Sequence, residues 1–137
     1  MGKRSWQYHT RKTLLQVLDL LPDAFDLGFR LQNQLGRGDF RGLAADGVNF
    51  AQGTSNSTVR NSNIRNNGDD GLAVWTSNVN AAPAGVNNVF TYNTIEFNWR
   101  AAGIAFFGGS GHKASYNLIV DGIGSSGFRM NTVFPGY

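Results

Sequence analysis

From Gly42 to the end of the chain, short apolar runs alternate with Asn, Gly and Ser, and they repeat at a nearly fixed interval. One series, at offsets of 24, 32 and 24, consists of DGVNF (46–50), DGLAV (70–74), AGIAF (102–106) and SGFRM (126–130). A second series, at offsets of 31 and 24, consists of Ile64, Ile95 and Ile119. Both series contain one insertion of seven or eight residues at the same place. Residues 77–86 have the Ala, Pro and Gly content of a protruding loop.

A period near 24 residues with two or three short strands per repeat predicts an all-β fold, a right-handed parallel β-helix of about four coils. Residues one period apart would stack about 4.8 Å apart, the spacing of paired strands. One inward stack would consist of Val48, Leu72, Ile104 and Phe128, and a second of the three isoleucines. Ser62, Asn93 and Asn117 would form a polar ladder at a turn, in which each side chain bonds its neighbour's backbone.

Residues 1–41 have a different pattern and no assigned role. Apolar residues recur at spacings of three and four, which predicts a short amphipathic helix interrupted at Pro22: Leu14, Leu15, Leu18, Leu21 and Phe25. The first 21 residues loosely resemble a signal peptide, but Asp19 interrupts the short apolar run, so we expect no signal peptide here. The β-helix is expected over residues 42–137.

Composition and charge narrow the choice of partner. Hydrophobic residues make up 41% of the chain and charged residues 15%, with no cysteine. The net charge of +3 lies in residues 1–42, whereas residues 43–137 balance five basic against five acidic residues. This balance argues against nucleic acid and other polyanions as partners. No stretch approaches the roughly 20 apolar residues of a membrane span. The sequence does not determine the oligomeric state.

The phrase NNGDDGLAVW (66–75) places two adjacent aspartates in an uncharged surrounding, where mutual repulsion should raise the pKa of one of them. The repeat places Asp46 one coil before Asp70, so three carboxylates would converge with Asp69. Asp-Gly turns are an alternative reading. Calcium binding is another, but it needs more oxygen ligands than three side chains provide, so we expect no metal and no other cofactor. Acid and base catalysis on a glycosidic bond needs one protonated carboxyl and one carboxylate that activates water.

ADGVNF (45–50), followed 23 residues later by GDDGLAVW (68–75), resembles the catalytic region of glycoside hydrolase family 87, the α-1,3-glucanases and mycodextranases. The resemblance runs from about Arg41 to Met130. It implies an extracellular β-helical enzyme that hydrolyses α-1,3-glucosidic bonds of a neutral glucan with inversion, through three aspartates. Asp69 would be the general acid, and Asp46 and Asp70 would hold and deprotonate the attacking water. Members of this family are much longer, so the chain would be a fragment.

Four other residues are candidate substrate contacts: Trp99, Arg100, Trp75 and His112. Sugar rings stack on exposed aromatic faces, although buried aromatic residues are commoner in a β-helix core. Two other functions stay open. A non-catalytic carbohydrate-binding or structural repeat predicts that the three aspartate side chains diverge. A polysaccharide lyase or epimerase on the same fold acts on uronates and usually needs Lys, Arg or calcium at the site, which the charge balance disfavours.

Overall fold

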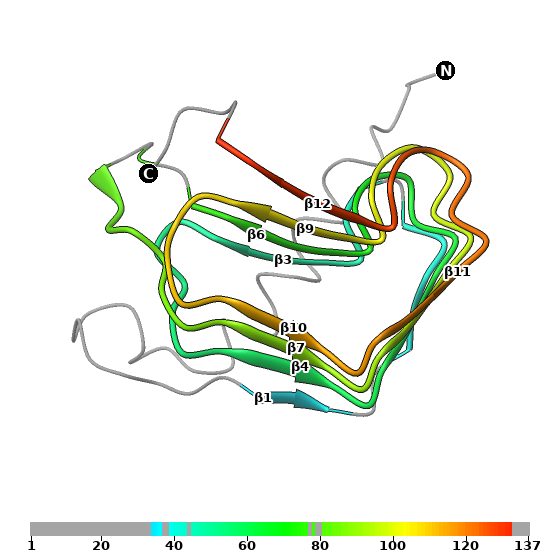
Figure 1. Ribbon diagram of the computed structural model, residues 1–137, viewed down its shortest axis with the longest axis horizontal. Helices are drawn as coiled ribbons and strands as arrows, with labels where there is room; N and C mark the ends of the chain where they lie inside the picture. Colours follow the sequence, from blue (N-terminus) through cyan, green and yellow to red (C-terminus); the bar gives the residue numbers. More distant parts are fainter. Residues whose placement is uncertain (1–33, 37–38, 44, 77, 79–80, 133–137) are drawn as a thin grey trace, which may run out of the picture.

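The computed structural model describes residues 34–36, 39–43, 45–76, 78 and 81–132. These residues form a parallel β-helix of four coils, with three strands in each coil and three four-stranded sheets (Figure 1). The predicted fold class is confirmed. The helix predicted near the start of the chain lies outside the described residues. No helix in the described ranges is long and apolar enough to cross a membrane.

Each sheet takes one strand from every coil. Sheet A contains β1 (Gln34–Gly36), β4 (Thr58–Arg60), β7 (Val89–Thr91) and β10 (Lys113–Ser115). Sheet B contains β2 (Asp39–Arg41), β5 (Asn63–Arg65), β8 (Thr94–Glu96) and β11 (Leu118–Val120). Sheet C contains β3 (Val48–Ala51), β6 (Leu72–Trp75), β9 (Ile104–Phe107) and β12 (Phe128–Asn131). The sheets therefore begin before residue 42, because β1 pairs with β4 and β2 pairs with β5.

The inward stack predicted for sheet C is confirmed, since Val48 pairs with Leu72, Leu72 with Ile104 and Ile104 with Phe128. The first three side chains are buried, whereas Phe128 in the last coil is 46% exposed. Burial of such aliphatic side chains contributes about 1.5–3 kcal/mol each to folding. The isoleucine stack is confirmed in sheet B.

Asparagine ladders hold the turns. The predicted ladder is present: Asn93 Oδ1 accepts from the Ser62 backbone N–H (3.1 Å), and Asn117 Oδ1 accepts from the Asn93 N–H (3.0 Å). In return, the Asn93 amide donates to the Val59 carbonyl (3.1 Å). Asn93 is buried, so these bonds satisfy polar groups that would otherwise be costly to bury.

The predicted insertion interrupts the repeat between β6 and β7. Thirteen residues (76–88) join these strands, whereas six (52–57) join β3 to β4. The described part of the loop forms no strand until Val86, which bridges Ser110. Pro83 packs closely on Gly53 of the first coil, so the loop leaves the register but folds back onto the preceding corner.

One further residue is added in the turn between β8 and β9, which explains why the offset is 32 in sheet C and 31 in sheet B.

Candidate active site

Asp46 and Asp70 lie at the same place on consecutive coils, in the turns that lead from sheet B into sheet C. Each is followed by a glycine and then by the first residue of a strand. Because Val48 pairs with Leu72, the two aspartates stack one coil apart, as predicted. Ala102 takes this place in the third coil, before β9.

The glycine after each aspartate is required by the close approach of the next coil. A Cβ on Gly47 would lie 2.5 Å from the Gly71 carbonyl oxygen, and a Cβ on Gly71 would lie 2.6 Å from the Gly103 carbonyl oxygen. Both separations are far inside van der Waals contact. The Asp-Gly phrases thus reflect the stacking of coils rather than the tight turns considered from sequence.

Gly71→Ala is expected to lower the free energy of unfolding by about 1–3 kcal/mol, because the added methyl group must push the second and third coils apart. Gly122→Ala is the matched control, since a Cβ there meets nothing within 4 Å. Thermal unfolding followed by circular dichroism measures the difference. Equal melting temperatures for the two variants would contradict the close stacking at Gly71.

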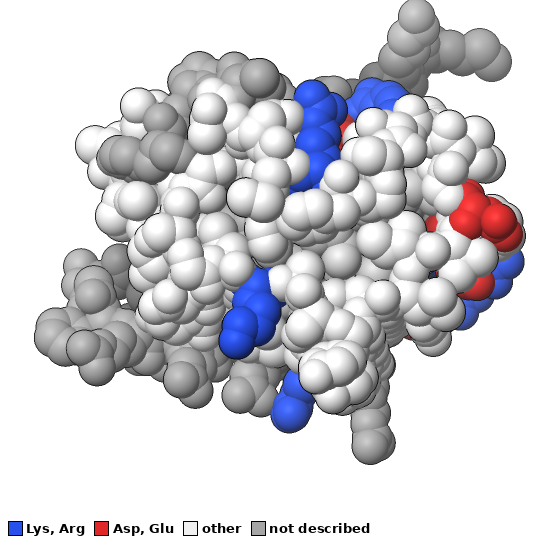
Figure 2. All heavy atoms as spheres, viewed as in Figure 1, with Lys and Arg blue, Asp and Glu red and all other residues white. Residues whose placement is uncertain are grey.

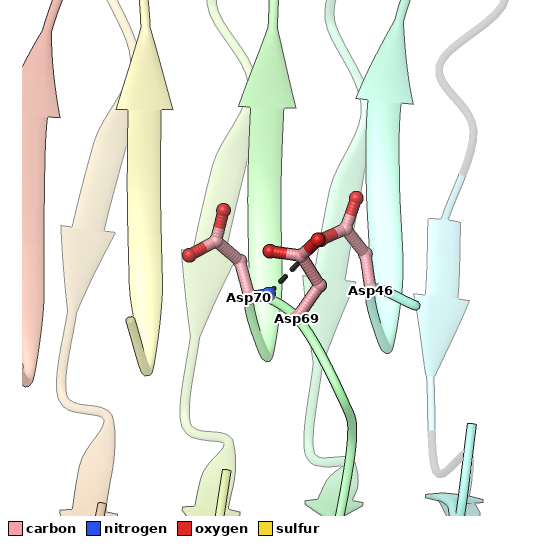
Figure 3. A group of neighbouring side chains, drawn as sticks. All are labelled: Asp46, Asp69 and Asp70. Atoms are coloured by element: carbon pink, nitrogen blue, oxygen red, sulfur yellow. Dashed lines mark hydrogen bonds between the residues drawn. The ribbon is translucent and has the colours of Figure 1, made fainter. Parts of the chain in front are cut away.

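Two backbone hydrogen bonds fix the stacked carboxylates. Asp46 Oδ1 accepts from the Asp70 backbone N–H (3.0 Å), which is the bond drawn in Figure 3, and Asp70 Oδ1 accepts from the Ala102 N–H (2.8 Å). Asp46 Oδ2 accepts from the Asn49 amide (2.7 Å). Each of these two aspartates thus accepts from the coil that follows it, whereas the ladder residues Asn93 and Asn117 accept from the coil that precedes them. The orientation of both carboxylates is set by the fold itself.

Asp69 completes the group. One oxygen from each of Asp46, Asp69 and Asp70 lies within 4.8 Å of the others. In Figure 3 the Asp69 carboxylate lies between the other two. Asp70 is 5% exposed, whereas the Asp69 side chain is 37% exposed. The three predicted residues therefore converge, with Asp46 and Asp69 half-buried and Asp70 buried.

Arg100, on the turn of the third coil, forms an ion pair with Asp69. Its guanidinium donates to Asp69 Oδ2, and its side chain is 58% exposed. Such an exposed pair contributes little to folding. The residue predicted to contact substrate thus holds a candidate catalytic carboxylate.

Burial raises the pKa of Asp46 to about 7, and repulsion from Asp69 and Asp70 contributes to this rise. Burial also raises the pKa of Asp70, against the opposing hydrogen bond from the Ala102 N–H. The expectation that at least one pKa rises is confirmed, although desolvation is a larger cause than the repulsion from which it was inferred. The group therefore retains a proton close to neutral pH.

The trio provides both forms of carboxyl that glycoside hydrolysis needs, a protonated acid and an ionised base. The oxygens of the three carboxyl groups lie close together, however. Inverting glycosidases usually hold the two carboxyls about 6.5–9.5 Å apart, and retaining ones about 5 Å apart. The 4.8 Å limit joins single oxygens, one from each residue, rather than the carboxyl groups themselves. The expectation of inversion therefore rests on the resemblance.

A cation could contact one oxygen from each aspartate, but the donor set fits poorly. Calcium takes about six to eight oxygen ligands. Here Arg100 occupies one side of Asp69, and backbone N–H groups occupy one oxygen each of Asp46 and Asp70. Acid and base chemistry fits these surroundings better.

The two tryptophans differ in their environment. Trp99 is 52% exposed and directly precedes Arg100, on the turn beside the trio. Trp75 pairs with Phe107 in sheet C and packs against a small cluster that includes Ala102. Trp99 thus has an exposed ring next to Arg100 in sequence, whereas Trp75 contributes to packing.

His112 lies at the other end of the sheet C strands, in the turn that leads into sheet A. Its Nδ1 accepts from the Asn88 backbone N–H (3.1 Å), and Asn88 Oδ1 in turn accepts from the Ser57 N–H (3.1 Å). Its ring centroid is 5.5 Å from that of Phe106. Burial lowers the pKa of His112. His112 takes the place of an asparagine in a second ladder, and the structure does not bring it to the trio.

Asn49 belongs to the site although it was not predicted. It is the first outward residue of β3, and its amide holds Asp46. Its own Oδ1 is buried without a hydrogen-bond partner in the described structure. The alternation of VNFA (48–51) places Asn49 on the outer face of the sheet, which was the signal available in the sequence.

The chain matches one protein family and one solved structure. Residues 31–137 match the family described as alpha-1,3-glucanase catalytic domain D2. The chain is also similar to the crystal structure of the Agl-KA catalytic domain, with a TM-score of 0.75 and 71% sequence identity. That similarity covers 80% of this chain and 20% of the other, so the chain corresponds to about a fifth of that domain's length. No curated protein matches the chain. By the extent of the family match, the chain belongs to the α-1,3-glucanase catalytic domain family.

Proposed function

We propose that this chain is the part of an α-1,3-glucan hydrolase that carries its catalytic aspartates. The observation that supports this most is the convergence of Asp46, Asp69 and Asp70 in one turn region of a family member. A non-catalytic repeat would have let these side chains diverge. A neutral polymer suits the surface, because Figure 2 shows a largely uncharged face with scattered basic groups and one acidic group at its right edge. Such a glucan polymer is too large to enter a cell, so the proposed reaction takes place outside the cell.

In the proposed mechanism Asp69 protonates the leaving glycosidic oxygen. Its side chain is 37% exposed, and no backbone hydrogen bond to its carboxylate is present in the described structure. Asp46 and Asp70 hold the attacking water between equivalent positions on adjacent coils and accept its proton. The resting proton favours Asp46, whose pKa is about 7, and must reach Asp69 through the coupled trio when substrate binds. The product is the inverted, β-configured sugar.

The test is hydrolysis of insoluble α-1,3-glucan, with reducing ends measured chemically and the anomer of the first product followed by NMR. It should use the chain itself and a chimera in which the chain replaces the matching fifth of the Agl-KA catalytic domain. The 71% identity makes this exchange practical. We expect the chimera to release β-configured sugar. A folded chimera without turnover would contradict the proposed role, and an α-configured first product would contradict inversion.

A further inference from the structure

Tyr92 and Tyr116 form a stacked pair on the outer edge of the β-helix, where sheet A turns into sheet B. Their ring centroids are 4.9 Å apart, and the ring planes differ by 7°. The two residues are 59% and 76% exposed. They follow Thr91 and Ser115, which pair in sheet A, so they occupy the same place on the third and fourth coils. In Figure 1 this corner lies beyond the ends of β7 and β10.

The backbone at this corner suits a different residue. Tyr92 and Tyr116 have φ angles of 54° and 55°, and Asn61, at the same place on the second coil, has a φ of 51°. The left-handed conformation is tolerated by asparagine and strained for bulky side chains. Strained residues of this kind cluster at ligand contacts and active sites. Phe97 also has such a φ angle (54°), so the backbone alone does not single out the two tyrosines. Their stacking and their exposure together indicate a use for the rings.

The surroundings of the pair match a neutral sugar. Stacking covers one face of each ring, and the 76% exposure of Tyr116 leaves its other face open to solvent. The hydroxyls of Thr91 and Ser115 bond each other beside the rings (3.3 Å). Asn93 and Asn117, which come next along the chain, bond backbone groups of the ladder, and Arg60, which pairs with Thr91 one coil earlier, adds one basic group at the border. A pyranose ring has an apolar face of C–H groups and a rim of hydroxyls, so it fits an open aromatic face with a polar border.

We propose that Tyr92 and Tyr116 form a second polysaccharide-binding site, which holds a neutral glucan chain away from the aspartates. The choice of glucan rests on the proposed function. The site is separated from the aspartate turns by one strand of sheet B, about 10 Å long. A second contact of this kind keeps an insoluble substrate close to the catalytic turn, since it raises the effective concentration of the chain end there.

The test is co-sedimentation of the full chain with insoluble α-1,3-glucan. The double variant Tyr92→Asn/Tyr116→Asn removes both rings and installs the residue that the backbone prefers. We expect its binding to be about tenfold weaker. Its melting temperature should stay within about 4 °C of the parent value, because relief of strain offsets the lost stacking. The matched control, Tyr92→Phe/Tyr116→Phe, keeps both rings and should retain most of the binding.

Unchanged binding of the double asparagine variant would overturn the inference, and so would preferential binding of polygalacturonate, an anionic polymer. A sample without glucan corrects for self-association. The assay is repeated in an Asp69→Asn background, where hydrolysis is expected to be lost. Ring-dependent binding there supports the site even if the catalytic proposal fails. If the tyrosine variants hydrolyse a soluble oligosaccharide at the parent rate, the result supports a site separate from catalysis. If their rate of hydrolysis falls as much as their binding does, the result contradicts that separation.

Discussion

Asp69→Asn is expected to lower the rate of α-1,3-glucan hydrolysis by about 10²–10⁴-fold in the chimera, because an amide cannot protonate the leaving oxygen. The substitution is nearly isosteric and lies on a half-exposed side chain that pairs only with the exposed Arg100 among the described residues. The fold should therefore remain intact. Release of reducing ends measures the rate, and circular dichroism checks the fold.

A substrate with a good leaving group separates the acid from the base. An aryl α-glucoside that leaves without protonation should restore much of the rate in Asp69→Asn but not in Asp46→Asn or Asp70→Asn. The opposite result would make Asp46 the acid, a role that its pKa of about 7 permits. The matched control is Asp121→Asn, an exposed aspartate in the turn after β11.

Asp46→Asn is expected to stabilise the folded chain above pH 7 while it lowers hydrolysis. Asp46 has a pKa of about 7 when folded, against a reference value of 3.8. Between these values the folded state binds more protons than the unfolded state, so the parent chain loses stability as the pH rises from about 4 to about 7. The full loss amounts to at most about 4 kcal/mol. The variant has no carboxylate to ionise there, so it avoids this loss.

Asn49 makes the replacement easier to accommodate. Its buried Oδ1 lacks a partner in the described structure, so rotation of its amide lets it accept from the new side chain. At pH 8 the variant should melt on the order of 10 °C above the parent, and at pH 4 the two should melt together. The parent melting temperature, corrected with Asp121→Asn, could instead stay constant between pH 5 and pH 8. That result would contradict a cost of ionising Asp46 in the folded state.

The repeat made much of this structure predictable. A side-chain stack such as Val48, Leu72 and Ile104 follows from the period alone, because residues one coil apart must lie above one another. The same logic brought Asp46 beneath Asp70. Features that depend on neighbouring surfaces were not predictable. β1 and β2 carry no recognisable repeat phrase, so their place in the sheets was missed.

The chemistry of the site shows the same limit. The identity of three carboxylates indicated mutual repulsion, but the larger cause of the raised pKa values is burial, which depends on how the turns pack. The ion pair between Arg100 and Asp69 joins the third coil to the second, and Arg100 lies in the turn between β8 and β9 that contains one extra residue. His112 was assigned from its chemistry, whereas its place in a ladder depends on Asn88, which lies 24 residues away.

In the described structure every sheet pairing joins one coil to the next. Such a chain can nucleate wherever two adjacent coils meet and then grow one coil at a time, because each step closes a loop of only some 24 to 32 residues. The aspartates belong to the first and second coils, but the Ala102 N–H and Arg100 that hold two of them belong to the third. Growth must therefore reach the third coil before the carboxylates are fixed, so the first two coils alone would lack an organised site.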